Sequence, residues 1–172
     1  MLNINQKMSD LIQNIDWDEN RLGPYKDWPQ TLISSFKLIL AASHPMAIYW
    51  GSDLVVVYND AWGRLIGKRH PQAFAQPFSK TFPEIWDRFK TDFNFVMSAK
   101  GSVEINNLST PPKSDLGPPL NSILNPIPLE DEMIGGILSI FKGSSTRNQP
   151  LTAFHQKDSI MELAFSTASL GV

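Results

Sequence analysis

Three histidines, His44, His70 and His155, are the side chains of this sequence best suited to acid–base or metal chemistry. None has a second histidine four residues away, the spacing at which one helix face binds a metal ion. None is followed by the Glu and Arg of a phosphoacceptor histidine. We therefore expect all three to be structural or solvent-exposed, and we expect no metal site.

Two carboxylates, Glu84 and Asp87, lie three residues apart and could act with His70 as the acid–base group of a small α+β hydrolase. Pro83 before them and Trp86 between them instead indicate the first turn of a helix, where acidic side chains interact favourably with the helix dipole. No nucleophile is organised around them. A hydrolase is therefore the last of the alternatives, and we predict no catalytic residue in this chain.

The sequence contains no cysteine, which excludes a disulfide, a thiolate metal site and a cysteinyl–flavin adduct. The pair Gly135-Gly136 resembles the glycines of a phosphate loop, but neither an acidic pair nor a Lys-Ser/Thr step follows it. We interpret this pair as part of a close-packed strand.

Three amphipathic helices are predicted to position the remaining candidate residues. Apolar residues recur at helical spacing over residues 7–15, over 29–43 up to His44-Pro45, and from Trp86 to Lys100, where Gly101 is the expected C-terminal stop. Only short helices fit between Asn59 and Pro83, because several prolines divide that stretch.

Five strands are predicted from runs rich in β-branched and aromatic residues. They cover residues 46–50, 54–58, 102–108, 120–129 and 133–141. The first two form a hairpin around Gly51-Ser52-Asp53. Pro126 and Pro128 each remove a ladder donor, so part of the fourth strand is expected at an edge or in an irregular position. The order of elements predicts an α+β fold with a five-stranded antiparallel sheet and helices on one face.

Composition sets the broad class of the protein. The chain has 172 residues, of which 42% are hydrophobic and 19% charged, and its net charge is −2. These values are typical of one folded globular domain with extensions. No Lys/Arg cluster supports nucleic-acid binding. No apolar run approaches the roughly 20 residues of a membrane helix, and the first ten residues lack a signal-peptide core, so we expect a cytoplasmic chain.

The order and spacing of five short motifs resemble the N-terminal PAS domains of bacterial sensor histidine kinases and related multi-domain signalling proteins. The resemblance covers roughly Trp17 to Ser145. The motifs are Leu22-Gly23-Pro24, Trp28-Pro29-Gln30, Pro45-Met46 with Tyr49-Trp50-Gly51, Tyr58-Asn59-Asp60-Ala61, and Phe82-Pro83-Glu84-Ile85-Trp86.

The resemblance implies a division of the chain into four parts. Residues 1–44 would be an N-terminal helical extension, 45–143 the PAS core, 144–159 a polar linker, and 160–172 the start of a further helix that is similar to the opening of a second PAS repeat. The segment from Ser109 to Pro119, with four prolines, departs from the hairpin usual at that place in the family.

PAS folds hold small ligands between the sheet and the long helix, and large apolar residues at that place are the candidates here. The predicted ligand pocket comprises Met46, Tyr58, Trp86, Phe89, Phe93, Met97 and Ile123. Such residues can equally fill a core. The identity of any cofactor stays open, although we expect no haem, because the helix from Trp86 to Lys100 contains no histidine ligand.

The apolar stripe of the first helix has two interpretations. Met8, Leu11, Ile12 and Ile15 lie on one face, which could either mediate a homodimer or pack on the chain's own sheet.

The resemblance implies a sensory domain that binds a small ligand, dimerises or does both, and thereby regulates a downstream histidine kinase in the same polypeptide as part of a phosphorelay. The alternatives are a pure dimerisation or scaffold domain with a filled core, a sensor coupled to a diguanylate cyclase and, last, the hydrolase.

Overall fold

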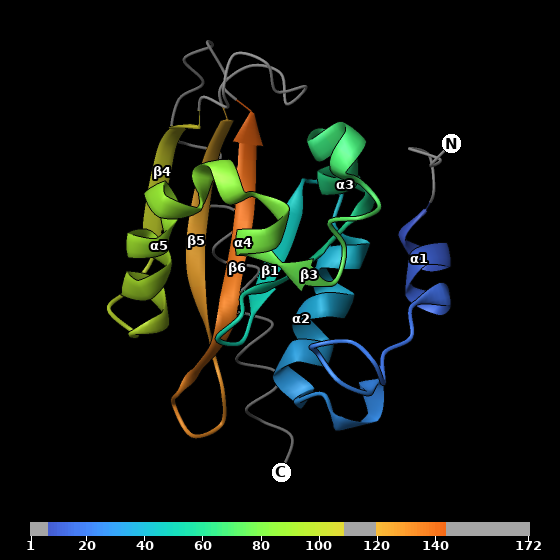
Figure 1. Ribbon diagram of the computed structural model, residues 1–172. Coiled ribbons are helices and arrows are strands. Elements are labelled where there is room, and N and C mark those ends of the chain that lie inside the picture. Colours follow the sequence, from blue (N-terminus) through green and yellow to red (C-terminus); the bar gives the residue numbers. More distant parts are fainter. Residues whose placement is uncertain (1–6, 109–119, 144–172) are drawn as a thin grey trace.

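The computed structural model describes residues 7–108 and 120–143, and its helices and strands are shown in Figure 1. The helices are α1 (Met8–Asn14), α2 (Gln30–Ala41), α3 (Asp60–Ile66), α4 (Phe78–Thr81) and α5 (Pro83–Met97), with short 3-10 turns η1 (Tyr25–Asp27) and η2 (Gly67–Arg69). The strands are β1 (Met46–Trp50), β2 (Val55–Tyr58), β3 (Gln76–Pro77), β4 (Val103–Leu108), β5 (Leu120–Pro128) and β6 (Ile134–Gly143).

The strands form one sheet in the order β3-β2-β1-β6-β5-β4, and every neighbouring pair is antiparallel. The predicted α+β fold is therefore confirmed, with six strands where five were expected. The additional strand, β3, has two residues and pairs with Val55 and Val56 at the sheet edge. Pro77 fits there because an edge strand tolerates a residue without an N–H donor.

The five predicted strands lie within a few residues of those observed. Pro126 and Pro128 fall where β5 extends beyond β4, whose pairing with β5 begins at the pair Val103 and Leu124. Beyond Leu124, β5 pairs only with β6 among the described strands, which confirms the expected edge position of this part of the strand. Both prolines therefore lie where the strand has no ladder partner on the β4 side.

The long helix α5 begins and ends earlier than predicted. It starts at Pro83, in the first-turn position that suits proline, and it ends at Met97 rather than at Lys100. Ala99, with a φ of 57°, already lies in the left-handed region that follows many helix ends. The chain therefore leaves the helix before Gly101.

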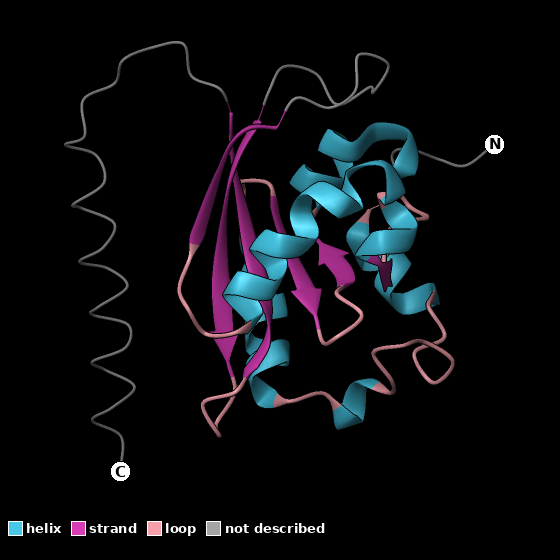
Figure 2. Cartoon of the chain, turned by 60° about the vertical axis from the view of Figure 1, so that its left-hand side comes forward, coloured by secondary structure: helices cyan, strands magenta, loops and turns pink. Residues whose placement is uncertain are grey.

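The two faces of the sheet differ in what covers them. On one face, Tyr49 of β1 contacts Phe78 of α4 and Phe93 of α5. Helices α3, α4 and α5 cover this face, and Figure 2 shows the helical layer beside the strands. On the other face, Ile48 and Val57 are fully buried, and α2 packs against their strands β1 and β2.

The N-terminal helices belong to the same core as the sheet. Met8, Trp28 and Leu32 are members of one buried cluster that also contains Tyr58 and Ile137. The backbone N–H of Met8 donates to Asp60 Oδ1 at 2.9 Å, which joins the start of α1 to the start of α3.

Asn59, between β2 and α3, joins three elements through its buried side chain. Its Oδ1 accepts from the backbone N–H groups of Met46 (3.2 Å) and Trp62 (3.0 Å). Its Nδ2 donates to the carbonyl oxygens of Ile39 and His44 at 3.0 and 2.7 Å. The α3 cap therefore also holds the end of α2 and the start of β1.

Close packing between β1 and β6 accounts for the predicted glycine pair. A Cβ on Gly136 would lie 2.6 Å from the Trp50 ring and 2.8 Å from the Tyr49 carbonyl oxygen. Since backbone cannot move away as a flexible side chain can, only glycine fits at this register position. The interpretation as a close-packed strand is confirmed.

No helix in the described part of the chain is long and apolar enough to cross a membrane. The predicted linker, 144–159, the predicted start of a second repeat, 160–172, and the proline-rich segment 109–119 lie outside the described residues.

Candidate functional site

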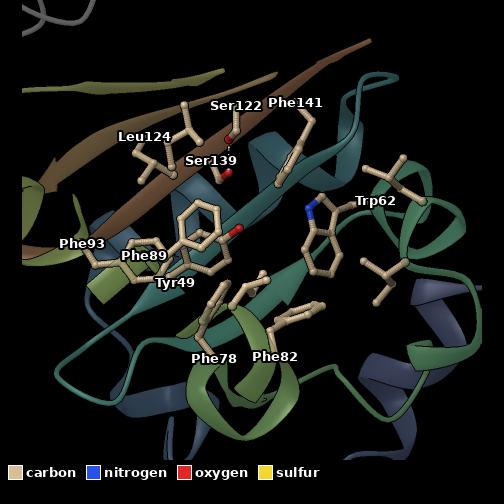
Figure 3. Close-up of a pocket in the computed structure, with 14 residues that line it drawn as sticks. Tyr49, Trp62, Phe78, Phe82, Phe89, Phe93, Ser122, Leu124, Ser139 and Phe141 are labelled. Carbon is tan, nitrogen blue, oxygen red and sulfur yellow. Dashed lines mark hydrogen bonds between the residues drawn. The ribbon is translucent and has the colours of Figure 1, made fainter. Parts of the chain in front are cut away.

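A cavity of about 60 Å³ lies between the inner face of the sheet and the helices α3, α4 and α5 (Figure 3). Roughly 10 to 15 Å³ on this measure is enough for one water molecule, so the space admits a molecule of several heavy atoms. The lining residues are Tyr49, Trp62, Leu65, Ile66, Phe78, Phe82, Ile85, Phe89, Phe93, Ile105, Ser122, Leu124, Ser139 and Phe141.

The lining of the cavity is aromatic and uncharged. Half of its fourteen residues are Phe, Tyr or Trp, and none is charged. The rings hold one another edge to face: Phe78 and Phe93 have centroids 4.8 Å apart at 80°, and Trp62 and Phe82 5.7 Å apart at 89°. Such contacts favour a defined wall over a loosely packed one.

Three hydroxyl groups lie together on the sheet wall. The Ser122 and Ser139 hydroxyls share a hydrogen bond of 2.8 Å, and Ser139 also bonds the Tyr49 hydroxyl. Burial raises the pKa of Tyr49 well above its usual range, and the bond with Ser139 offsets part of that rise. Tyr49 is therefore a neutral hydrogen-bonding group and not a general base.

Trp62 contributes a polar atom from the helical wall. Its side chain is 2% exposed, and its Nε1 has no hydrogen-bond partner. The sequence places it there because Asn59 caps α3, which sets Trp62 in the first turn with its backbone N–H bonded to that cap.

Arg69 of η2 ties the helical wall together beside the cavity. Its guanidinium donates to the Thr81 carbonyl and to the Glu84 carboxylate, and it lies 4.9 Å from the centroid of the Phe82 ring. These contacts connect η2, which directly follows α3, with the end of α4 and the start of α5, and Phe82 lies between those two helices.

Two of the seven predicted pocket residues, Phe89 and Phe93, line the cavity. Tyr58 is buried under α3 against Trp62 and Phe74, outside the lining. Trp86 is half-buried behind the cavity wall, where its ring centroid is 6.3 Å from that of Phe93.

The other three predicted pocket residues lie further away. Met97 is half-buried in the last turn of α5. Met46 and Ile123 both pair with Ile140 across the sheet, and both face away from the cavity, because their neighbours Ala47 and Leu124 share the cavity side with Ser139. The predicted set is therefore not brought together as one site.

The residues considered for hydrolase chemistry have other partners. His70 is 4% exposed, and its Nδ1 shares a hydrogen bond of 3.0 Å with the Tyr58 hydroxyl. Glu84 pairs with Arg69, and Asp87 pairs with Lys90 at 2.8 Å. The structure thus provides no assembled acid–base group from these three residues.

The apolar stripe of α1 packs on the chain itself. Met8 is 1% exposed, and Leu11, Ile12 and Ile15 are half-buried against the same core. This face therefore packs on the chain's own core, as the second interpretation had it, and dimerisation stays a prediction.

Twelve of the fourteen lining residues were not predicted from the sequence, and three sets among them show what signal the sequence held. Trp62, Leu65 and Ile66 have the i, i+3, i+4 spacing of a helix face, which could have pointed to them once Asn59 was recognised as a cap. Ser122 and Ser139 are polar residues inside apolar strands, a pattern that often marks a polar group facing a cavity. Phe78 gave no signal, because prolines divide the stretch around its short helix, and Phe82 was noted only as part of a motif shared with PAS domains.

No family model and no curated protein matches the chain. Among solved structures, a sensory box sensor histidine kinase from Vibrio cholerae is 18% identical, with a TM-score of 0.48 over 64% of this chain and 88% of that one. A PAS domain from Colwellia psychrerythraea is 18% identical, with a TM-score of 0.49 over 67% of this chain and 98% of that one. The phage VqmA–DPO complex is 13% identical, with a TM-score of 0.53 over 77% of this chain and 59% of that one.

At these identities a likeness concerns the fold alone. The antiparallel pairing and the position of α3, α4 and α5 on one face agree with the predicted fold class, while α2, from the predicted N-terminal extension, packs on the other face. The chain therefore has a PAS-like α+β fold.

Proposed function

We propose that this chain is a sensory domain that binds a small molecule in the cavity between the sheet and α3, α4 and α5. The observation that carries the proposal is the cavity itself, since its lining is apolar and aromatic and includes a few side chains that carry a hydroxyl or an indole N–H. Binding pockets for small molecules have this composition.

The fold supports the same proposal. VqmA, which shares the fold, was solved as a complex with DPO. The resemblance of the sequence to N-terminal domains of sensor histidine kinases supports such a kinase as the output, and a diguanylate cyclase is the alternative output.

Signal transfer would follow from the position of the cavity. Its lining comes from α3, α4 and α5 and from the strands β1, β4, β5 and β6, so a ligand would contact both layers of the fold at once. A ligand changes the output only through different affinities for two packings of these layers. The competing proposal is a scaffold or dimerisation domain whose cavity never takes a ligand.

The first test is the native mass and absorbance spectrum of the purified chain. A mass above that of the polypeptide would identify a bound molecule directly. If the chain is empty, its thermal unfolding is measured with and without benzene, a probe of one-ring size. Benzene should raise the midpoint, because a ligand that binds only the folded state stabilises it by mass action.

A variant that fills the cavity makes this test specific. Leu65→Phe adds volume at the lining and should abolish the benzene effect, whereas Leu38→Phe, at a side chain that is 60% exposed on α2, should retain it. An equal benzene effect in both variants would place the binding elsewhere. No effect in the wild type, together with a mass of twice the chain, would favour the dimerisation domain.

A further inference from the structure

The unpaired indole N–H of Trp62 is exceptional within the described residues. It is the one buried side-chain nitrogen or oxygen there without a hydrogen-bond partner. Two other tryptophans have paired N–H groups: Trp17 donates to the Ile12 carbonyl at 3.1 Å and Trp28 to the Gly23 carbonyl at 3.0 Å. A buried donor without an acceptor is unfavourable, so few buried polar groups in folded proteins lack a partner, and each such group calls for a physical explanation.

The Trp62 N–H lies on the edge of the ring that faces the sheet wall across the cavity. Trp62 is a lining residue, and in Figure 3 the nitrogen edge of its ring is turned toward the wall that carries Tyr49 and Ser139. A molecule in the cavity would therefore find a hydrogen-bond donor on the helical wall and hydroxyl groups on the sheet wall.

The hydroxyl groups on the sheet wall can donate hydrogen bonds to a ligand or accept them from it. Tyr49, Ser139 and Ser122 form a row joined by two hydrogen bonds. Three hydroxyls supply three protons, and two bonds use two of them, so one proton and several lone pairs remain. The hydroxyl groups of this wall can therefore bond either a donor or an acceptor of the ligand. The indole N–H of Trp62 can only donate, so it requires an acceptor on the ligand.

The lining also limits the charge of the ligand. None of the fourteen lining residues is charged, and a buried ion without a counter-charge is strongly unfavourable. Seven aromatic rings around a small space favour a flat molecule that packs edge to face against them.

From these features we propose that the cavity selects a small, neutral, planar ring compound that carries a hydrogen-bond acceptor, and that Trp62 Nε1 donates to that acceptor. The proposal rests on the proposed function, because it names the chemical class of the sensed molecule. Ser139 and Tyr49 then contact the opposite edge of the ring.

The test compares two probes of the same shape. Benzene and pyridine have equal ring size. In mildly alkaline buffer both are uncharged, and only pyridine has a hydrogen-bond acceptor, its ring nitrogen. Dissociation constants of both probes are measured for the wild type, for Trp62→Phe and for the matched control Trp28→Phe. Trp28 is similarly buried, at 5% exposure, but its N–H is paired and it does not line the cavity.

A substitution changes the cavity shape for both probes alike. The ratio of the two dissociation constants therefore reports the contribution of the hydrogen bond alone. Trp62→Phe should lower the preference for pyridine about fivefold to tenfold, the worth of one hydrogen bond. Trp28→Phe should leave it within about twofold. An unchanged ratio in Trp62→Phe, with both probes still bound, would overturn this proposal and leave the proposed function intact. Failure of both probes to bind the wild type would overturn both.

Nuclear magnetic resonance of the wild type gives a second readout that needs no folded variant. The Trp62 indole ¹⁵N signal should move downfield with pyridine and much less with benzene. An indole signal that responds equally to both probes would contradict the proposal. So would a water molecule that stays on the N–H while pyridine is bound.

Discussion

The phenol of Tyr49 is buried within the cavity wall, and its neutral form is strongly preferred in the folded protein. Burial raises the pKa of Tyr49, and burial likewise raises the pKa of Tyr58. Above about pH 10 the unfolded chain loses these protons while the folded chain keeps them. The free energy of unfolding should therefore fall by about 1.4 kcal/mol per pH unit for each buried tyrosine.

Urea unfolding at several values between neutral pH and the alkaline range measures this slope. Tyr49→Phe should reduce the slope by the contribution of one group, although the variant also loses the bond to Ser139 at every pH. Tyr25→Phe, at a side chain that is 45% exposed, is the matched control for the loss of one phenol. A slope that responds equally to both changes would contradict a raised pKa of Tyr49.

Asn59 is the residue on which the arrangement of α2, β1 and α3 depends most. It is 1% exposed, and its amide bonds backbone groups of all three elements. Asn59→Ala leaves two buried N–H groups and several carbonyls without that partner. We expect the free energy of unfolding to fall by about 3–4 kcal/mol, measured by chemical denaturation.

A second variant separates the capping role of Asn59 from its donor role. Asn59→Asp keeps oxygen acceptors for Met46 and Trp62 but replaces the donor with an oxygen that faces carbonyl groups. It should remain destabilised, whereas a near-native stability would mean that the cap alone matters. Asn14→Ala, at an exposed amide within α1, should change the stability by no more than about 0.5 kcal/mol.

Among the elements, α5 ends in a conformation that its sequence does not favour. Ala99 has a φ of 57°, and its N–H bonds the Val96 carbonyl at 3.1 Å as the helix closes. Glycine adopts this conformation without the steric penalty of a Cβ. Ala99→Gly should therefore raise the free energy of unfolding by about 0.5–1 kcal/mol.

A similar position with ordinary dihedrals provides the matched control. Ala42 follows the end of α2 with a φ of −79°. Ala42→Gly adds freedom to the unfolded chain without relieving strain, so it should lower the stability by a comparable amount. Thermal unfolding of the two variants should give shifts of opposite sign, and a destabilised Ala99→Gly would contradict the assigned backbone conformation.

The strands show what local sequence could and could not predict. Runs such as Val55-Val56-Val57-Tyr58 have strong strand composition, and their positions were predicted within a few residues. Which side of a strand faces the cavity depends on long-range pairing, and a shift of one residue reverses every side chain. Ile123 was predicted in the pocket, but its neighbour Leu124 is the residue that faces it, as the pairing of Leu124 with Ser139 shows.

At the level of the whole molecule, the cavity could be predicted only in part. The spacing of Phe89 and Phe93 on a long amphipathic helix, together with the resemblance to PAS domains, identified part of the helical wall. The part of the helical wall that contains Trp62 and Leu65 could be predicted only with the knowledge that the short helix α3 folds back over the same sheet. That contact depends on the bonds of Asn59 to distant carbonyls, which no local pattern reveals.

The first 44 residues were predicted as an extension separate from the PAS core, and the packing allows this boundary to be tested. Met8 is 1% exposed and belongs to the same buried cluster as Ile137 of β6. If α1 folds with the sheet, Met8→Ala should lower the free energy of unfolding by about 2–4 kcal/mol, because it opens a cavity in the shared core.

The form of the transition decides between the two arrangements. With one core, helix loss measured by circular dichroism and loss of tertiary structure measured by tryptophan fluorescence should shift together in Met8→Ala as a single transition. If the extension folds independently, α1 of the variant would unfold before the rest of the chain, and the unfolding transition of the sheet would stay at its wild-type midpoint. Leu38→Ala, at an exposed site on α2, controls for general helix effects and should change the stability by no more than about 0.5 kcal/mol. A single shifted transition would make α1 part of the folding unit that encloses the cavity, so that ligand binding and the position of the N-terminal helix are linked through one equilibrium.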